Sequence, residues 1–224
     1  MSVTVVVMTD GRRDCLERSL ATVDRLRGPV SVKVIHDDTG DPRHHEWLWQ
    51  RFTGHGWCIV TTDRRSGFAG AYAHAWQWLT DHDRNDWILS TEDDFTFNRD
   101  VDLHAVIDVL TAHPHLAQMA LRRQAWNAAE RAAGGVIELD PDAYTDRRDA
   151  DGRQWLEHRR FFTTNPSLYR RTLTARGWPT GAHSEGVFSA ELFTDPAAAC
   201  GYWGARDDPP WVTHIGQHRS GHGY

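Results

Sequence analysis

The chain has 224 residues, of which 40% are hydrophobic and 25% are charged, as in an ordinary soluble globular protein. This length supports one sizeable α/β domain or two small ones. The net charge of −6 disfavours nonspecific binding to nucleic acid. No apolar run approaches the ~20 residues needed to span a bilayer. The N-terminus lacks a secretory signal, and the three widely spaced cysteines form no zinc pattern, so we expect reduced thiols in a cytoplasmic protein.

The first hundred residues alternate apolar runs, typical of buried strands, with stretches of helical period. Strands are predicted at residues 3–8, 30–35, 57–61 and 87–90. Helices are predicted near residues 14–23, 44–52 and 72–79. This β-α order predicts a mostly parallel sheet with right-handed crossovers.

The remainder of the chain is less regular, although no repeat or linker divides it. A helix capped by Asp102, a strand at residues 116–121 and two helices near residues 167–176 and 185–199 are predicted. Residues 139–159 are dense in Asp and Arg and poor in apolar side chains. Such a segment is typical of a mobile or lid-forming loop, or equally of a solvated insertion.

Three consecutive acids, Glu92, Asp93 and Asp94, directly follow the strand predicted at residues 87–90. In an open α/β sheet, ligands bind at the carboxyl ends of the strands. Adjacent carboxylates repel one another unless a cation neutralises them, and oxygen ligands suit Mg²⁺ or Mn²⁺. The motif therefore predicts a metal-bridged phosphate ligand, with an acidic, solvated turn as the alternative.

Polar segments also follow two other predicted strands, at residues 9–12 (Thr-Asp-Gly-Arg) and 37–38 (Asp-Asp). Because the ends of parallel strands lie side by side, we favour one shared site over three unrelated turns. A fourth segment, residues 65–71, is rich in small residues and precedes a helix, whose N-terminus favours an anion. A plain loop explains its two glycines nearly as well.

The order of these segments resembles the family 2-like glycosyltransferases of the GT-A fold. Residues 5–12 resemble the family's first strand and nucleotide loop, and residues 34–40 resemble its Asp-Asp-x-Ser segment. Residues 65–71 resemble its Asn-x-Gly-x-Ala-x-Ala segment, and residues 92–94 its Asp-x-Asp motif, with Glu at the first position. The resemblance implies a single Rossmann-like GT-A domain over residues 1–224, with a mostly parallel central sheet and flanking helices. Its nucleotide-sugar half would span about residues 1–98, and its acceptor half about residues 99–224.

This resemblance also implies roles for individual residues. Asp38 would receive the base of a nucleotide, with Thr9 and Arg65 near it. Asp93 would contact the ribose, and Asp94 would hold Mn²⁺ or Mg²⁺ on the diphosphate. The other residues that we assign to the nucleotide-sugar site are Asp10, Arg12, Gly67, Ala71 and Glu92.

Two downstream segments extend the resemblance. Residues 182–186 resemble the family's Glu-Asp element, which supplies the catalytic base, but Gly186 replaces the Asp and leaves Glu185 as the candidate. An ordinary helix start is the alternative, and Glu191 and Asp195 are the next acids to consider. Residues 211–216 resemble the segment whose late His completes the metal site in some GT-A enzymes, which implies His214 as a ligand; a surface histidine is the alternative.

Two further patterns concern side chains outside these motifs. His214, His218 and His222 recur every four residues, as on a zinc-binding helix, but the nearby glycines disfavour a helix. Trp126 and Trp155 could form the floor of an acceptor site, although core packing is the usual role of tryptophan.

The resemblance implies a metal-dependent, inverting glycosyltransferase of the hexosyltransferase type. Its donor would be a nucleotide-sugar, with a UDP-sugar as the first expectation. Because no membrane anchor is visible, we expect a soluble acceptor such as a protein, a small molecule or a polymer. One alternative is a sugar-nucleotidyltransferase, although the Gly-rich loop of those proteins is absent after Met8. The other is a non-catalytic nucleotide- or sugar-binding module, which would keep the carboxylates but need no base.

Overall fold

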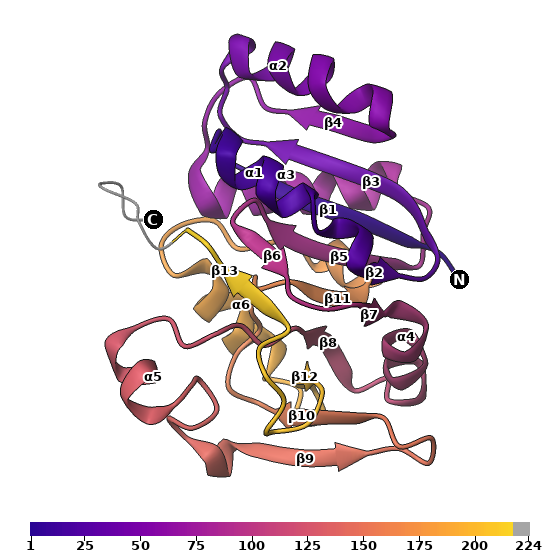
Figure 1. Ribbon diagram of the computed structural model, residues 1–224, viewed down its shortest axis with the longest axis vertical. Coiled ribbons are helices and arrows are strands. Elements are labelled where there is room, and N and C mark those ends of the chain that lie inside the picture. Colours follow the sequence, from indigo (N-terminus) through magenta and orange to yellow (C-terminus); the bar gives the residue numbers. More distant parts are fainter. Residues whose placement is uncertain (217–224) are drawn as a thin grey trace.

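The computed structural model describes residues 1–216, so His218 and His222 of the histidine repeat lie outside the described residues. A nine-stranded sheet forms the centre of the molecule (Figure 1). Its strands are, in order, β4 (Trp57–Thr61), β3 (Val30–Asp37), β1 (Val3–Thr9), β5 (Trp87–Glu92), β11 (Ser167–Arg170), β8 (Leu116–Ala120), β12 (Ala199–Trp203), β10 (Gln154–His158) and β9 (Tyr144–Arg148).

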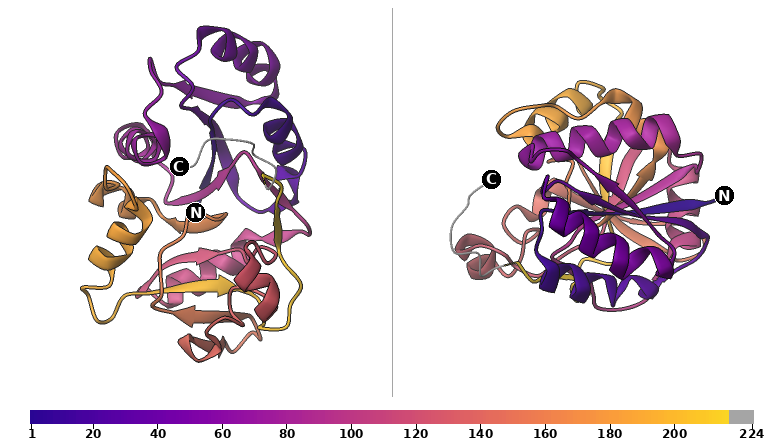
Figure 2. Two further views of the ribbon diagram at one scale, coloured as in Figure 1. Left: turned by 90° about the vertical axis from the view of Figure 1, so that its left-hand side faces the viewer. Right: turned by 90° about the horizontal axis from the view of Figure 1, so that it is seen from above.

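The first four strands of this order are parallel, as the sequence predicts. All seven residues of β1 are buried, because helices cover both faces of the sheet. Helices α1 (Arg13–Leu20) and α2 (Pro42–Phe52) pack on one face, where Leu16 and Leu48 join the core. Helices α3 (Gly67–His82) and α6 (Ser184–Leu192) cover the other face, as the view from above in Figure 2 shows.

The second half of the sheet is mixed. Among the nine strands, β11 and β10 run against the other seven. Helix α4 (Leu103–Ala112) begins as predicted at Asp102, whose carboxylate accepts hydrogen bonds from the backbone N–H groups of His104 and Ala105. The prediction of an α/β fold with a mostly parallel sheet and flanking helices is confirmed.

Two predicted helices in this half differ from the structure. The helix near residues 167–176 is wrong over its first four residues, and the helix near residues 185–199 is too long. Residues 167–170 form β11, and only residues 171–176 are helical, as a 3₁₀ helix. Residues 167–170 adopt a strand because they pair with β5 and β8. In this strand Leu168 and Tyr169 are buried in the cores on opposite faces of the sheet. The helix predicted to reach residue 199 ends at Leu192, and Pro196 lies in the turn that leads into β12.

The charged segment 139–159 forms a β-hairpin rather than a lid-forming loop or a solvated insertion. Strands β9 and β10 pair antiparallel, and β9 is the outermost strand of the sheet. Four of the five β9 residues are exposed, whereas Trp155 and Leu156 of β10 are buried. Charged side chains are typical of an edge strand, because they discourage pairing with other chains. The density of Asp and Arg therefore reflects a sheet edge.

Small elements complete the fold. Strand β13 (Val212–His214) pairs antiparallel with β6 (Phe95–Phe97), and β2 (Leu26–Arg27) pairs with β7 (Val101–Asp102). The remaining helices are α5 (Ala128–Ala133) and the 3₁₀ turns Val23–Arg25, Thr53–His55 and Pro141–Ala143. Since β6 directly follows the three acids, its pairing with β13 brings residues more than a hundred positions later to the carboxyl end of β5. Within residues 1–216, no helix combines the length and apolarity that crossing a membrane requires.

Candidate active site

The carboxyl ends of β1, β3 and β5 meet at one edge of the sheet, where a cleft of about 1070 Å³ opens. A notch of about 30 Å³ adjoins it and shares Arg65, Gly67, Phe68 and Glu92 with the cleft wall. Of the nine residues assigned to the nucleotide-sugar site from the sequence, eight line this notch: Thr9, Asp10, Arg12, Asp38, Arg65, Gly67, Ala71 and Glu92. The ninth, Asp93, is fully buried behind them.

Arg12 is the centre of the polar network at the strand ends. Its guanidinium group donates hydrogen bonds to Asp93 and Asp94, and its Nε–H donates to Asp10 Oδ1 at 3.1 Å. Thr9 Oγ1 donates to Asp93 Oδ2 at 2.7 Å, and Arg65 donates to Asp10 Oδ2 at 2.9 Å. The sequence predicts a metal as the counter-charge of these acids; the structure adds an arginine that shares this task.

The two buried aspartates differ in their readiness to ionise. Burial raises the pKa of Asp93 to about 7, against the opposing charge of Arg12. Burial also acts to raise the pKa of Asp94, but the hydrogen bond with His214 and the charges of His214 and Arg12 outweigh it, so that the pKa of Asp94 lies below its ordinary value. Asp94 is therefore the carboxylate that remains negative at neutral pH.

The structure places His214, the histidine that the resemblance implies as a metal ligand, next to Asp94. His214 Nε2 lies 2.9 Å from Asp94 Oδ2. The imidazole stacks between Phe95, at 4.6 Å between ring centroids, and Trp126, at 3.8 Å. The side-chain amide of Gln124 binds both the backbone N–H and the backbone carbonyl of His214 at 2.9 Å. The position of His214 is thus fixed on two sides and through its backbone.

These residues can hold a divalent cation only together with oxygens from a substrate. Asp94 Oδ1 is buried and has no hydrogen-bond partner in the described structure, and His214 Nε2 lies beside the other oxygen. No cluster of three or more potential ligand side chains occurs in residues 1–216. Mg²⁺ and similar ions are often bound by one or two carboxylates and completed by phosphates and water. The donor set therefore fits a cation that binds with a diphosphate.

Asp38 has a structural role that the sequence did not reveal. Its Oδ2 accepts hydrogen bonds from the backbone N–H groups of Ser66, at 3.0 Å, and Gly67, at 2.8 Å, and its Oδ1 accepts one from the Ser66 hydroxyl. These contacts anchor the start of α3, where a carboxylate is favoured by the helix dipole. The carboxylate also lines the notch, so its predicted contact with a nucleotide base would be a second role.

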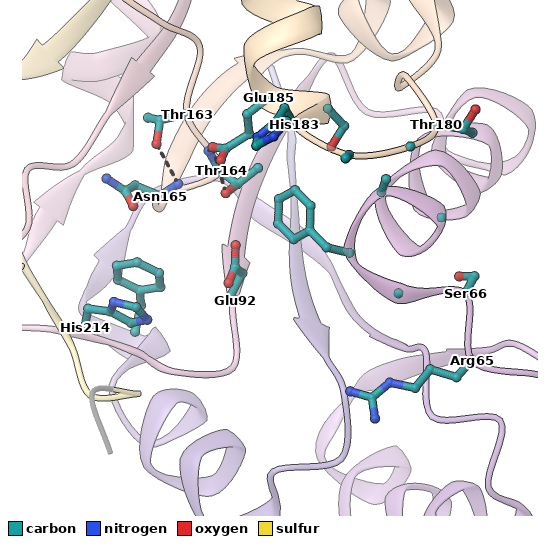
Figure 3. Close-up of a pocket in the computed structure, with 18 of the residues that line it drawn as sticks. Arg65, Ser66, Glu92, Thr163, Thr164, Asn165, Thr180, His183, Glu185 and His214 are labelled. Atoms are coloured by element: carbon teal, nitrogen blue, oxygen red, sulfur yellow. Dashed lines mark hydrogen bonds between the residues drawn. The ribbon is translucent and has the colours of Figure 1, made fainter. Parts of the chain in front are cut away.

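Glu185 lies in the first turn of α6 and faces the cleft from the side opposite Glu92 (Figure 3). Its Oε1 accepts hydrogen bonds from the backbone N–H of Thr164, at 2.8 Å, and from the Thr164 hydroxyl, at 3.1 Å. Burial raises the pKa of Glu185, although the Thr164 contacts oppose this shift. Glu191 and Asp195 are exposed and do not line the cleft, so neither replaces Glu185 as a candidate base.

The part of the cleft wall that lies in the second half of the chain contains two residues for which the sequence provides little or no signal. Arg123 lines the cleft and forms a bidentate ion pair with Glu130, at 2.6 and 3.1 Å, and Glu130 also accepts the backbone N–H of Trp126 at 2.7 Å. Trp126 lines the cleft as well, whereas Trp155 is only 2% exposed and belongs to the core. Of the two tryptophans considered as an acceptor floor, only Trp126 is in a position to serve.

No protein-family model and no curated protein matches this chain. Solved structures do match it. TarS 1-349 of S. aureus in complex with UDP-GlcNAc is 13% identical, with a TM-score of 0.63, and the match covers 99% of this chain and 60% of that one. The mannosyltransferase PcManGT from Pyrobaculum calidifontis, in complex with GDP-Man and Mn²⁺, is 16% identical, with a TM-score of 0.62 and coverage of 97% and 57%. GalNAc-T7 with UDP, GalNAc and Mn²⁺ is 10% identical, with a TM-score of 0.68 and coverage of 96% and 44%.

The chain therefore has the GT-A fold of these glycosyltransferases, as its sequence motifs implied. It spans between 44% and 60% of the length of the three structures.

Proposed function

We propose that this chain transfers a sugar from a nucleotide-diphosphate sugar to an acceptor hydroxyl, with inversion at the anomeric carbon. One observation carries the proposal: the notch lined by the eight predicted nucleotide-side residues adjoins a cleft that also contains His214 and Glu185. The GT-A fold is compatible with it, and solved structures of this fold contain UDP-GlcNAc, GDP-Man and UDP.

The strand-end side of the cleft would hold the donor. Arg12 and Arg65 provide two cationic groups at the notch, and the N-terminus of α3 adds a partial positive charge that favours phosphate. Asp38 would accept a hydrogen bond from a ring N–H of the base, which uracil, thymine and guanine all offer. Asp93, held by Thr9 and Arg12, would lie behind the ribose. A UDP-sugar remains the first donor to test.

Asp94 and His214 would hold Mn²⁺ or Mg²⁺ together with the diphosphate. A bound cation of this kind would neutralise the negative charge that develops on the leaving diphosphate. Arg12, which already contacts Asp94, would supply a further positive charge at the same place.

Glu185 would act as the general base. Its carboxylate takes the proton of the acceptor hydroxyl while the hydroxyl oxygen forms a bond to the anomeric carbon and the bond from that carbon to the diphosphate oxygen breaks. Thr164 holds the carboxylate in place. Burial raises the pKa of Glu185 towards neutral pH, and a general base is most effective when its pKa lies near the working pH. Attack from the face opposite the diphosphate inverts the configuration without a covalent enzyme intermediate.

The structure offers less support for the two alternative functions. In a sugar-nucleotidyltransferase, a long Gly-rich loop would follow the first strand, but only residues 10–12 separate β1 from α1. A non-catalytic binding module would need the strand-end carboxylates but would not need Glu185 in the cleft wall.

A donor screen tests the proposal. UDP-, GDP- and TDP-sugars are incubated with Mn²⁺, and release of the nucleoside diphosphate is measured with and without EDTA. We expect release from one class of donor that is abolished by EDTA. If no donor releases its nucleoside diphosphate although that nucleotide binds, the chain is a binding module and the proposal is wrong.

A further inference from the structure

A third cavity, besides the cleft and the notch, lies along α6 next to Glu185. Its volume is about 410 Å³, within the usual range for small-molecule sites. Its walls are formed by one side of α6 and the segment 160–163, and it shares Thr163 and Glu185 with the main cleft. We call this cavity the α6 groove. Glu185 and Thr163 thus belong to the walls of both spaces, which places the groove next to any molecule that presents a hydroxyl to Glu185 in the cleft.

The lining of the α6 groove combines polar groups with the rings of Phe161 and Phe193. Phe161 and Phe193 are half-buried, which leaves part of each ring in contact with solvent, and Ala190 lies exposed on α6 between the two rims. Apart from Glu185, the only charged side chain of the lining is Arg160, which is 54% exposed and pairs with Asp140 at 3.3 Å. Apolar and aromatic surface of this kind stabilises an apolar group through burial and ring contacts.

Gly186 opens the groove beside the candidate base. In the sequence pattern that this segment resembles, an Asp stands at this position. A Cβ atom added to Gly186 would meet no heavy atom within 4 Å, so the glycine leaves open space on the helix surface. The replacement of Asp by Gly thus removes both a negative charge and the bulk of a side chain next to Glu185. Both changes make this place more suitable for an uncharged, bulky part of a substrate.

The walls of the α6 groove are held together before any ligand binds. Ser189 Oγ accepts a hydrogen bond from the backbone N–H of Phe162 at 2.8 Å and donates one to the carbonyl of Glu185 at 2.6 Å. Arg159 binds the carbonyl groups of Phe193, at 3.0 Å, and Pro196, at 2.6 Å, which closes the far end of α6 onto the same segment. A preformed groove binds a ligand without the cost of ordering its own walls.

We infer that the acceptor carries an aromatic group next to its accepting unit, and that the α6 groove binds this group while Glu185 receives the hydroxyl proton. The inference rests on the proposed function, because it assigns the groove to the acceptor. It predicts that an aryl glycoside binds better than the corresponding methyl glycoside, since only the aryl group reaches the apolar walls.

Pairs of phenyl and methyl glycosides of glucose, galactose, mannose and N-acetylglucosamine test this inference. Their affinities for the full chain are measured by saturation-transfer NMR and calorimetry. We expect the phenyl member of at least one pair to bind ten-fold or more tightly than its methyl partner. Ala190→Trp, which fills the groove, should abolish this advantage. Val187→Trp is the matched control, because Val187 is 43% exposed on the same helix but does not line the groove, and it should retain the advantage.

A second blocking variant guards against misfolding of the first. Gly186→Leu places a side chain in open space and should also remove the advantage, and thermal melting of all three variants reports on their folding. The inference would be overturned if the two members of every pair bind equally, or if no glycoside binds. It would also be overturned if the phenyl advantage survives in folded Ala190→Trp or Gly186→Leu. Because these measurements contain no donor nucleotide, their failure is separate from a failure of the donor screen.

Discussion

At the scale of single residues, the site is a cluster of carboxylates whose charges are balanced by few partners. Arg12 contacts three aspartates, Thr9 supports Asp93, and His214 supports Asp94. The unpartnered Oδ1 of Asp94 is the one feature of this cluster that indicates a missing partner within the described residues. A cation bound with a diphosphate would provide that partner.

Replacement of Asp94 tests this assignment. Asp94→Ala should weaken the binding of the nucleoside diphosphate in the presence of Mn²⁺ at least ten-fold and remove its dependence on Mn²⁺, while Arg12 keeps Asp93 and Asp10 as partners and preserves the fold. Calorimetry with and without Mn²⁺ measures the effect. Asp100→Ala serves as a control, because Asp100 is exposed and, within residues 1–216, forms an ion pair with Arg27 outside the notch. A nucleotide affinity in Asp94→Ala that still depends on Mn²⁺ as in the wild type would remove Asp94 from the metal site.

Asp38 combines a structural contact with a proposed binding contact, and a matched variant separates the two. Asp38→Ala removes the partner of two backbone N–H groups at the start of α3, which should lower the free energy of unfolding by about 2 kcal/mol. It should also weaken nucleotide binding. Asp41→Ala removes a comparable cap at α2, a bond to the Arg43 N–H at 2.9 Å, outside the notch. The Asp41 variant should lose stability alone; an Asp38 variant with wild-type nucleotide affinity would leave Asp38 with only its structural role.

The residue contacts also show which features of the site can be predicted from the sequence and which cannot. The strand-end clusters are visible because a buried apolar run points to the polar residues that follow it, as with Thr9 and Glu92. The pairing of Asp38 with Ser66 and the support of His214 by Gln124 join residues 28 and 90 positions apart. No local pattern encodes such contacts, because they arise from crossovers and strand pairing that the chain makes only when folded.

At the scale of elements, two short pieces determine the geometry of the cleft. The β6–β13 pair carries His214 to the end of β5, and α6 presents Glu185 from the other side (Figure 3). The helical periods of α2 and α3 and the apolar runs of β1 and β5 were readable from the sequence. Strands β9, β11 and β12 were not, because their residues become strands only through pairing with neighbours.

The β9–β10 hairpin leads to a prediction opposite to that of a mobile lid. The backbone amides of Trp155 and Leu156 lie in a strand paired on both sides and buried in the sheet, so they should exchange slowly with solvent before any ligand is added. Addition of nucleotide and Mn²⁺ should change their exchange little. Hydrogen-exchange mass spectrometry measures this directly. Rapid exchange of these amides in the free protein, followed by markedly slower exchange with nucleotide, would contradict this prediction and support a mobile lid.

At the scale of the whole molecule, one continuous sheet joins a parallel half to a mixed half (Figure 1). Residues from both parts of the chain line the cleft. Two buried histidines, one in each half of the sheet, have lowered pKa values. Burial, with a smaller effect of Arg160, lowers the pKa of His158 to about 4, and burial lowers the pKa of His36 to about 3. Such groups make the stability of the molecule sensitive to acid.

His158 allows this sensitivity to be measured. In the unfolded chain the imidazole takes up a proton below about pH 6.5, whereas in the folded protein it stays neutral until about pH 4, so acid favours unfolding within this interval. Between about pH 6.5 and about pH 5, the wild type should lose about 1.5 kcal/mol more unfolding free energy than His158→Gln. Urea unfolding at the two pH values measures the difference. Carboxyl groups with raised pKa values act in the opposite sense but are common to both proteins. Equal pH slopes would show that His158 does not contribute.

The central claim is that Glu185 removes the proton of the acceptor while the strand-end residues hold the donor. The most direct measurement compares wild type and Glu185→Gln for binding of the nucleotide-sugar selected by the donor screen and for its turnover with Mn²⁺ and an acceptor. The amide keeps the shape of the side chain and its contact with Thr164 but cannot accept the proton. We predict an unchanged affinity for the nucleotide-sugar and a turnover reduced by ~10²–10⁴-fold. Turnover within a few-fold of the wild type in a folded Glu185→Gln protein would contradict the account.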